Sequence, residues 1–340
     1  MPDIAELLKK VRRIEIVAKR AVDDLFSGQY KSVFRGRGME FSEVREYLPG
    51  DDIRSIDWNV TARAGRPYIK RFVEERELTI LFLVDVSASG MFGSQRSKLE
   101  TAVEIAATLM FSALKNNDKV GLVTFADRVL DFYQPRKGRA NVLRLIRELL
   151  TVKPVVSPTN LREVLDYVNR IQKRRAVVFL LSDFLVPELI AAENEPKDSN
   201  IAWDSRIDKF FSGHGRIERN LFLHSVRRPG AAQASSQEQA LSICGRKHDL
   251  IAMTITDPRE HGFPDVGFIT LRDAETGELV EVDTADPKIR QLLTQQFNFG
   301  HEKIAATLRR CQIDRLDLAT NGDFVGGLRR FFHAREKRYR

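Results

Sequence analysis

The chain has 340 residues, of which 43% are hydrophobic, and its formal net charge is +8. This length and apolar content suffice for a sizeable core in one large or two smaller domains, which excludes a chain that is disordered throughout. The two cysteines, Cys244 and Cys311, suggest neither a disulfide framework nor a zinc cage, and no apolar run approaches the roughly 20 residues of a membrane span, so we expect a cytoplasmic protein without one.

The first 76 residues precede the main domain and fall into two parts. Apolar residues at spacings of three and four from Ile4 to Phe26 predict an amphipathic helix. Residues 30–75 show short alternating segments broken by glycine and proline, which predict a small β-rich extension. Its charged stretch from Arg45 to Trp58 could be a recognition surface or a catalytic carboxylate pair. We favour an internal salt-bridge lattice with Trp58 as a core anchor, because Pro49-Gly50-Asp51-Asp52 is typical of a turn.

From Leu78 onward, the alternation of strands and helices predicts an α/β domain with a doubly wound, mainly parallel sheet. We assign this domain to residues 77–333. The expected strands cover residues 78–84, 119–125, 128–133, 176–182, 250–256 and 313–318, with a hairpin around 266–283. The expected helices cover residues 97–116, 139–151, 161–173, 286–310 and 322–333.

A polar insertion at residues 187–247 interrupts this domain, and residues 334–340 form a basic tail. Long connections without a pattern are uncommon in compact domains, and the polar composition favours partial disorder. The alternative is a short helix that docks on the domain or on a partner. That helix would use the apolar residues Trp203, Phe210, Phe211, Leu221, Phe222 and Leu223.

Polar residues follow the apolar run Leu78–Val84, where the first strand of the domain is expected to end. Asp85, Ser87 and Ser89 alternate along the chain, so a turning loop can point one carboxylate and two hydroxyls into a single concavity. Mg²⁺ favours such a sparse set of oxygen ligands, because it retains part of its water shell. The competing interpretation is that these three residues only cap the following helix.

Two further oxygen donors are expected at the same edge of the sheet. Thr159 lies in a loop before a helical stretch, and Asp183 ends a second apolar strand, 176–182. Open parallel sheets bind ligands at the carboxyl ends of their strands, where the strand order reverses. The sequence therefore predicts a Mg²⁺ site, with Mn²⁺ or Ca²⁺ as alternatives.

The pattern Asp85-x-Ser87-x-Ser89, followed by Thr159 and Asp183, resembles the metal-ion-dependent adhesion site of von Willebrand factor A domains. The resemblance implies that fold for the domain. It also implies that Ser87 and Ser89 touch the ion, that Thr159 does so directly or through water, and that Asp85 and Asp183 act largely through water.

A second resemblance rests on residues upstream of the strand. Gly38–Phe41, Arg45–Arg54 and Ile56–Trp58 resemble the bacterial family called domain of unknown function 58. Together the two resemblances cover residues 20–186 and 248–333. The family resemblance implies a MoxR-type AAA+ ATPase as a partner.

The sequence lacks a P-loop, a Gly-x-Ser-x-Gly elbow and a His-Glu-x-x-His motif, so we expect no enzyme. The favoured function is a metal-dependent protein–protein interaction module, in which a partner supplies a carboxylate to the ion, acting in protein assembly or maturation. No nucleic-acid partner is expected for such a module. The alternative is a basic nucleic-acid or anionic-membrane binder that uses the cations of residues 329–340, although we favour a solvated helix end for them. A metal-assisted hydrolase is least favoured, since no general base is placed by the sequence.

Overall fold

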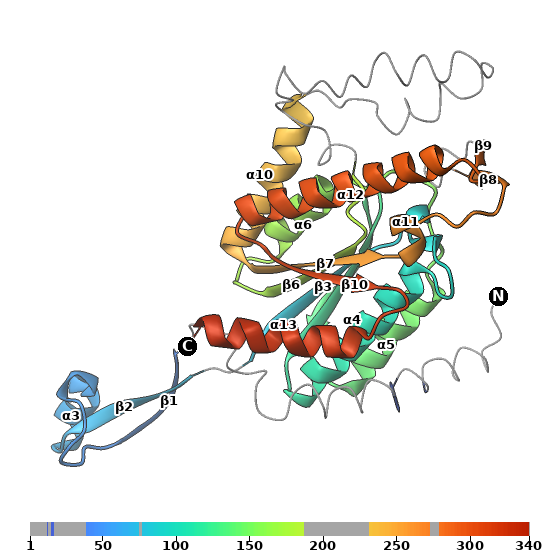
Figure 1. Cartoon of the computed structure of the whole chain (residues 1–340). Coiled ribbons are helices and arrows are strands. Elements are labelled where there is room, and N and C mark those ends of the chain that lie inside the picture. Colours follow the sequence, from blue (N-terminus) through green and yellow to red (C-terminus); the bar gives the residue numbers. More distant parts are fainter. Residues whose placement is uncertain are drawn as a thin grey trace.

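The computed structural model of the chain describes residues 39–74, 77–186, 231–272 and 279–339, together with Arg12, Glu15 and Ile16. Most of the predicted helix at Ile4–Phe26 lies outside the described residues, as do residues 187–230 with the apolar residues of the insertion. The described residues form a six-stranded sheet with helices on both faces (Figure 1). The predicted α/β class is therefore confirmed.

The central sheet is mixed but mostly parallel, with the strand order β10-β7-β6-β3-β4-β5. Only the pair β4 and β5 is antiparallel. The chain runs from β3 to β4 on one side, whereas β6 returns on the other side of β3. The strand order thus reverses between β3 and β6, which is where such sheets bind ligands. The strands are β3 (Thr79–Asp85), β4 (Lys119–Phe125), β5 (Val129–Arg136), β6 (Val177–Ser182), β7 (Asp249–Thr256) and β10 (Asp314–Ala319).

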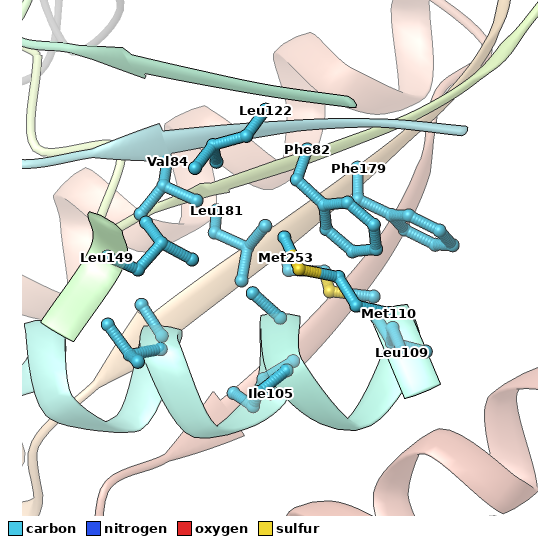
Figure 2. Packing of buried hydrophobic residues seen from close by; sticks show 14 of the residues in the cluster. Phe82, Val84, Ile105, Leu109, Met110, Leu122, Leu149, Phe179, Leu181 and Met253 are labelled. Carbon is cyan, nitrogen blue, oxygen red and sulfur yellow. The ribbon is translucent and has the colours of Figure 1, made fainter. Parts of the chain in front are cut away.

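Two apolar cores, one on each face, hold the sheet between its helices. In β3, Phe82 and Val84 face one core, whereas Leu81 and Leu83 face the other. Since both faces are buried, the strand is apolar along its whole length. In the first core, Phe82 stacks on Phe179 of β6, with ring centroids 5.2 Å apart, above the side chains of α4 (Figure 2).

Three helices cover each face of the sheet (Figure 1). The first face carries α4 (Lys98–Lys115), α5 (Arg139–Thr151) and α13 (Phe324–Tyr339). The second face carries α6 (Leu161–Ile171), α10 (Ala231–Lys247) and α12 (Pro287–Arg310). Short elements complete the domain: η2 (Ala88–Met91), α11 (Pro258–His261) and the antiparallel pair β8 (Phe268–Arg272) and β9 (Leu279–Asp283).

Two segments differ from their predictions. The end of the predicted insertion is helix α10, which buries Ala240, Leu241 and Cys244 in the second core. Its apolar stripe consists mostly of small residues, so its composition resembled that of a disordered stretch. The predicted basic tail is the end of α13, which continues to Tyr339.

The β-rich extension is a hairpin of β1 (Met39–Glu46) and β2 (Tyr68–Glu74), with η1 (Ile53–Ser55) and α3 (Trp58–Ala64) between its strands. It lies apart from the central sheet (Figure 1). The prediction that Trp58 anchors a core is wrong: the residue is 68% exposed, because it begins α3 at the tip, where it is not covered by a second layer of the described chain.

The charged residues of the tip serve local structure. Arg45 pairs with Asp51 at 2.7 Å, while Asp52 caps η1 and Asp57 caps α3. Arg45 also holds the pKa of the Asp51 carboxyl below its usual value, helped by the Leu48 N–H. These contacts fit the predicted structural role of the stretch better than a catalytic carboxylate pair.

Candidate functional site

The first part of the site is the segment that follows β3. Its backbone folds back on the carboxylate of Asp85, whose Oδ1 accepts a hydrogen bond of 2.9 Å from Ser87 N. Residues 86–88 also pair with Val155 through two backbone hydrogen bonds, Ala88 N to Val155 O at 2.8 Å and Val155 N to Val86 O at 2.9 Å. This pairing fixes the loop after α5 against the end of β3. Thr159 follows in that loop and is carried to the same place.

Four of the five predicted residues meet through their side-chain oxygens. Thr159 Oγ1 lies 3.1 Å from both Asp85 Oδ2 and Ser87 Oγ. Ser87 Oγ lies 2.9 Å from Ser89 Oγ. The structure thus brings one carboxylate and three hydroxyls from two distant segments into a single cluster.

The competing interpretation, that these residues cap the next helix, fails on geometry. Ser87 precedes η2 but its side chain makes no cap hydrogen bond. The helix α4 is capped instead by Ser97, whose hydroxyl accepts from Glu100 N at 3.0 Å while the Glu100 carboxylate accepts from Ser97 N. The hydroxyls of Ser87 and Ser89 are therefore available to the cluster.

The end of β6 supplies the second carboxylate and a residue that the sequence analysis missed. Ser182 Oγ donates to Asp85 Oδ2 at 2.7 Å and accepts from Phe184 N at 3.0 Å. Asp183 lines the same small cavity as Asp85, Ser87 and Ser89. The chain turns sharply after Asp183, because Phe184 has a φ of 57°, which is uncommon for a residue other than glycine.

Beside Asp183 lies a buried ammonium that no sequence signal indicated. Lys98, the first residue of α4, is 3% exposed, and its Nζ donates to Asp183 Oδ2 at 3.1 Å. It also forms an ion pair with Glu260 of α11. A lysine at the start of an amphipathic helix is normally solvated, so only the fold reveals this three-residue ion cluster.

Burial and mutual repulsion set the charges of the cluster. Burial and the nearby Asp183 charge together raise the pKa of Asp85 to about 6, against the hydrogen bonds from Ser182 and Ser87, which lower it. Burial also lowers the pKa of Lys98, but the carboxylates of Asp183 and Glu260 outweigh it and leave that pKa above its usual value. Burial raises the pKa of Glu260, against the effect of Lys98.

A further buried carboxylate, Asp257, ties the site loop to the neighbouring strands. Its Oδ2 accepts hydrogen bonds from Ser94 N at 2.9 Å, from Ser94 Oγ at 3.1 Å and from Thr320 Oγ1 at 2.5 Å. Burial raises its pKa, but these bonds and one from Arg259 N outweigh burial, so the pKa lies below its usual value. Asp257 therefore fixes Ser94, which lies five residues after Ser89 in the chain, to the ends of β7 and β10.

The donor set fits a small, hard cation. The described residues contain no group of three or more His, Cys, Asp or Glu side chains arranged to hold a metal. The donors of the cluster are oxygen atoms, from two carboxylates and three hydroxyls. Asp85, Ser87, Ser89 and Asp183 line a cavity of about 10 Å³, which Lys98 lines as well. This volume is near the minimum for one water molecule. Mg²⁺ prefers such sparse oxygen sites, whereas zinc cages need nitrogen or sulfur.

The cations at the end of the chain are partly used inside the protein. Arg335 is buried and pairs with Asp249 and Asp314, and Arg338 pairs with Asp314 at 2.6 Å. These contacts reduce the free positive charge that a nucleic-acid or lipid surface would meet. They favour the helix-end interpretation of this cluster.

Comparison with known proteins places the chain among uncharacterised relatives. A family model described as "Protein of unknown function DUF58" matches residues 43–196 and 232–301. The chain is 28% identical over 338 residues to the uncharacterised protein Rv1480 of Mycobacterium tuberculosis, covering 98% of this chain and 92% of the relative.

The solved structures to which this chain is similar include two from Bacteroides species. Protein BatB of Bacteroides thetaiotaomicron is 14% identical, with a TM-score of 0.40 over 76% of this chain and 99% of BatB. An aerotolerance-related membrane protein of Bacteroides fragilis is 13% identical, with a TM-score of 0.40 over 77% of this chain and 99% of that protein.

These comparisons correct the predicted location. The expectation of a cytoplasmic protein is contradicted by these comparisons, because the Bacteroides fragilis neighbour is described as a membrane protein. The expectation rested on cysteine content and on the lack of a long apolar run, and neither property fixes the compartment of a protein. Among the described helices, none is long and apolar enough to cross a bilayer.

Proposed function

The chain belongs to this family of unknown function, DUF58, and we propose that it is a non-enzymatic, metal-dependent protein-interaction module. The site is the oxygen cluster at the carboxyl ends of β3 and β6. The single observation that carries the proposal is the meeting of Asp85, Ser87, Ser89 and Thr159 beside a cavity that Asp183 also lines. In this proposal the domain is von Willebrand factor A-like.

Mg²⁺ is the proposed ion, with Mn²⁺ or Ca²⁺ as alternatives. Ser87, Ser89 and Thr159 would hold it, with Asp85 and Asp183 acting largely through water. When bound, the ion supplies an electrophile that accepts a carboxylate oxygen from a partner protein. Because only two of the protein donors are carboxylates, the ion keeps part of its charge for that carboxylate.

The protein side chains prepare this site without the ion. Asp85 accepts hydrogen bonds from Ser87 N, Thr159 Oγ1 and Ser182 Oγ, so one carboxylate orients three segments of chain. Burial keeps water from competing for these contacts. Asp183 and Glu260 both pair with Lys98, which leaves them poorly suited to act as a general base.

The family resemblance supplies the proposed partner, a MoxR-type AAA+ ATPase, or another protein that presents an acidic side chain. In either case, binding requires both the ion and the partner carboxylate. We propose a role in the assembly or maturation of other proteins, together with that partner.

The test is capture of a purified MoxR-type ATPase by the immobilised chain, with Mg²⁺ or with chelator. We expect Asp85→Ala to remain folded and to lose at least about tenfold in Mg²⁺-dependent affinity, a change of about 1.4 kcal/mol. The matched control is Asp166→Ala, which removes an exposed aspartate of α6 and should bind as the wild type does. Equal capture by Asp85→Ala, or by the wild type in chelator, would rule out the mechanism.

A further inference from the structure

Lys98 occupies a position that a simple metal site would leave open. Its ammonium lines the same cavity as Asp85, Ser87 and Ser89, and it reaches Asp183 Oδ2 at 3.1 Å. The other oxygen of Asp183 accepts a hydrogen bond from Leu185 N at 3.2 Å. Both oxygens of Asp183 are therefore engaged within the protein.

The charges around the cavity depend on Lys98 for their balance. Asp85, Asp183 and Glu260 are buried carboxylates, and Lys98 is the buried cation that pairs with two of them. When all four are ionised, three negative charges and one positive charge leave two negative charges. This excess of negative charge attracts a divalent ion, and the positive charge of Lys98 reduces that attraction.

Glu260 gives Lys98 a second partner that does not belong to the oxygen cluster. Glu260 Oε1 pairs with Lys98, while its Oε2 accepts a hydrogen bond of 2.8 Å from Asp257 N. The capping box of α11 thus holds the Glu260 carboxylate in place. The Glu260 carboxylate therefore attracts Lys98 away from Asp183, although Glu260 does not line the cavity of the proposed ion.

From this arrangement we infer that Lys98 is an internal competitor of the divalent ion, and that Glu260 limits this competition. Lys98 shares Asp183 with the ion and repels it, so it weakens metal binding. Glu260 takes part of the ammonium's charge and so strengthens metal binding. The inference rests on the proposed function, because it assigns the residues that set the affinity of that same site.

The pair also explains how the site stays folded without an ion. A buried carboxylate left without a counter-charge is costly. Without Lys98, the carboxylates of Asp183 and Glu260 would both lack a counter-charge, with Asp85 nearby. Lys98 neutralises part of this charge at all times. A metal site with such a resident cation exchanges its ion readily, whereas a site built of carboxylates alone would hold it more tightly.

The test is the dissociation constant of Mn²⁺, measured from the electron paramagnetic resonance signal of the free ion at one neutral pH. We expect Lys98→Met to bind Mn²⁺ at least about tenfold more tightly than the wild type, because a positive charge leaves the cavity. We expect Glu260→Gln to bind about tenfold more weakly, because Lys98 then has Asp183 as its main partner. The double variant should bind Mn²⁺ as Lys98→Met does, because Glu260 acts on the ion through the lysine.

Opposite shifts distinguish competition from a purely structural role, since damage to the fold would weaken binding in every variant. If Lys98→Met does not fold, Lys98→Gln takes its place, because glutamine removes the positive charge and keeps a polar side chain. Equal or weaker binding by Lys98→Met, or unchanged binding by Glu260→Gln, overturns the inference while the proposed function stands. If the wild type and Lys98→Met both fail to bind Mn²⁺ at millimolar concentration, the proposed function fails and the inference falls with it.

Discussion

His248 shows how one buried side chain joins two strands. It lies between α10 and β7 with no exposed surface, and its Nδ1 accepts a hydrogen bond of 3.3 Å from Ala176 N, just before β6. Its own backbone N donates to Cys244 O at 2.8 Å. Because Nδ1 is an acceptor here, the ring must be neutral for this contact to persist. Burial, together with the charges of Lys247 and Arg175, lowers the pKa of His248 to about 4.

This lowered pKa predicts a loss of stability in acid. Between pH 6.5 and about pH 4 the unfolded chain binds the proton that folded His248 refuses, so the free energy of unfolding falls as the pH falls through this window. The shift from 6.5 to about 4 corresponds to at most about 3 kcal/mol. We expect His248→Asn to keep the acceptor and to lose less stability over this window than the wild type does, in denaturant unfolding at several pH values.

The matched control for this prediction is the exposed histidine of α13. His333→Asn should have the same pH profile as the wild type, because its side chain is exposed on the surface of α13. If His248→Asn has the same pH profile as the wild type, His248 does not cause the loss of stability in acid.

Helix α13 separates its cations into two groups with different roles. Arg329, Arg330 and Lys337 are exposed along one side, whereas Arg335 points inward and is 2% exposed. Arg335 pairs with Asp249 of β7 and with Asp314 of β10, so it joins α13 to the beginnings of two adjacent strands. The sequence pattern of basic residues cannot show this difference, because it depends on the helix axis relative to the sheet.

We therefore expect Arg335 to matter for stability and its exposed neighbours to matter little. Arg335→Met should lower the free energy of unfolding by about 3–5 kcal/mol, because Asp249 and Asp314 would lose a buried counter-charge. Arg330→Met, on the exposed side of the same helix, should change it by about 0.5 kcal/mol or less. Denaturant unfolding of the two variants checks this, and similar values for both would show that the buried ion pairs contribute no stability.

At the scale of the whole molecule, periodicity predicts those parts of the fold that are encoded locally. The apolar runs that become β3 and β6 each end at an aspartate, and this alone placed Asp85 and Asp183 at one edge of the sheet. The predicted hairpin around 266–283 is also present as β8 and β9. Strands buried on both faces carry a strong and unambiguous signal.

What the sequence could not show is the set of contacts between distant segments. Lys98 meets Asp183 across 85 positions of the chain, and Ser182 meets Asp85 across 97. The same holds for Trp58, whose exposure depends on what covers the hairpin tip and not on its own pattern. The buried cation beside the predicted oxygen donors is therefore a property of the folded molecule alone.

The oxygen cluster draws on β3, β6 and the loop before α6, so a bound ion links its own binding to the folding of the whole domain. An ion that binds only the folded state stabilises it by about 2.7 kcal/mol at a concentration one hundred times its dissociation constant. We expect Mg²⁺ to raise the denaturant midpoint of the wild type and of Asp166→Asn, followed by far-UV circular dichroism. Asp85→Ala should show no such rise, and an equal rise in that variant would indicate a non-specific salt effect. Since Lys98 already pairs with Asp183 and Glu260, chelator should lower the midpoint without unfolding the protein, unlike a zinc finger deprived of its metal.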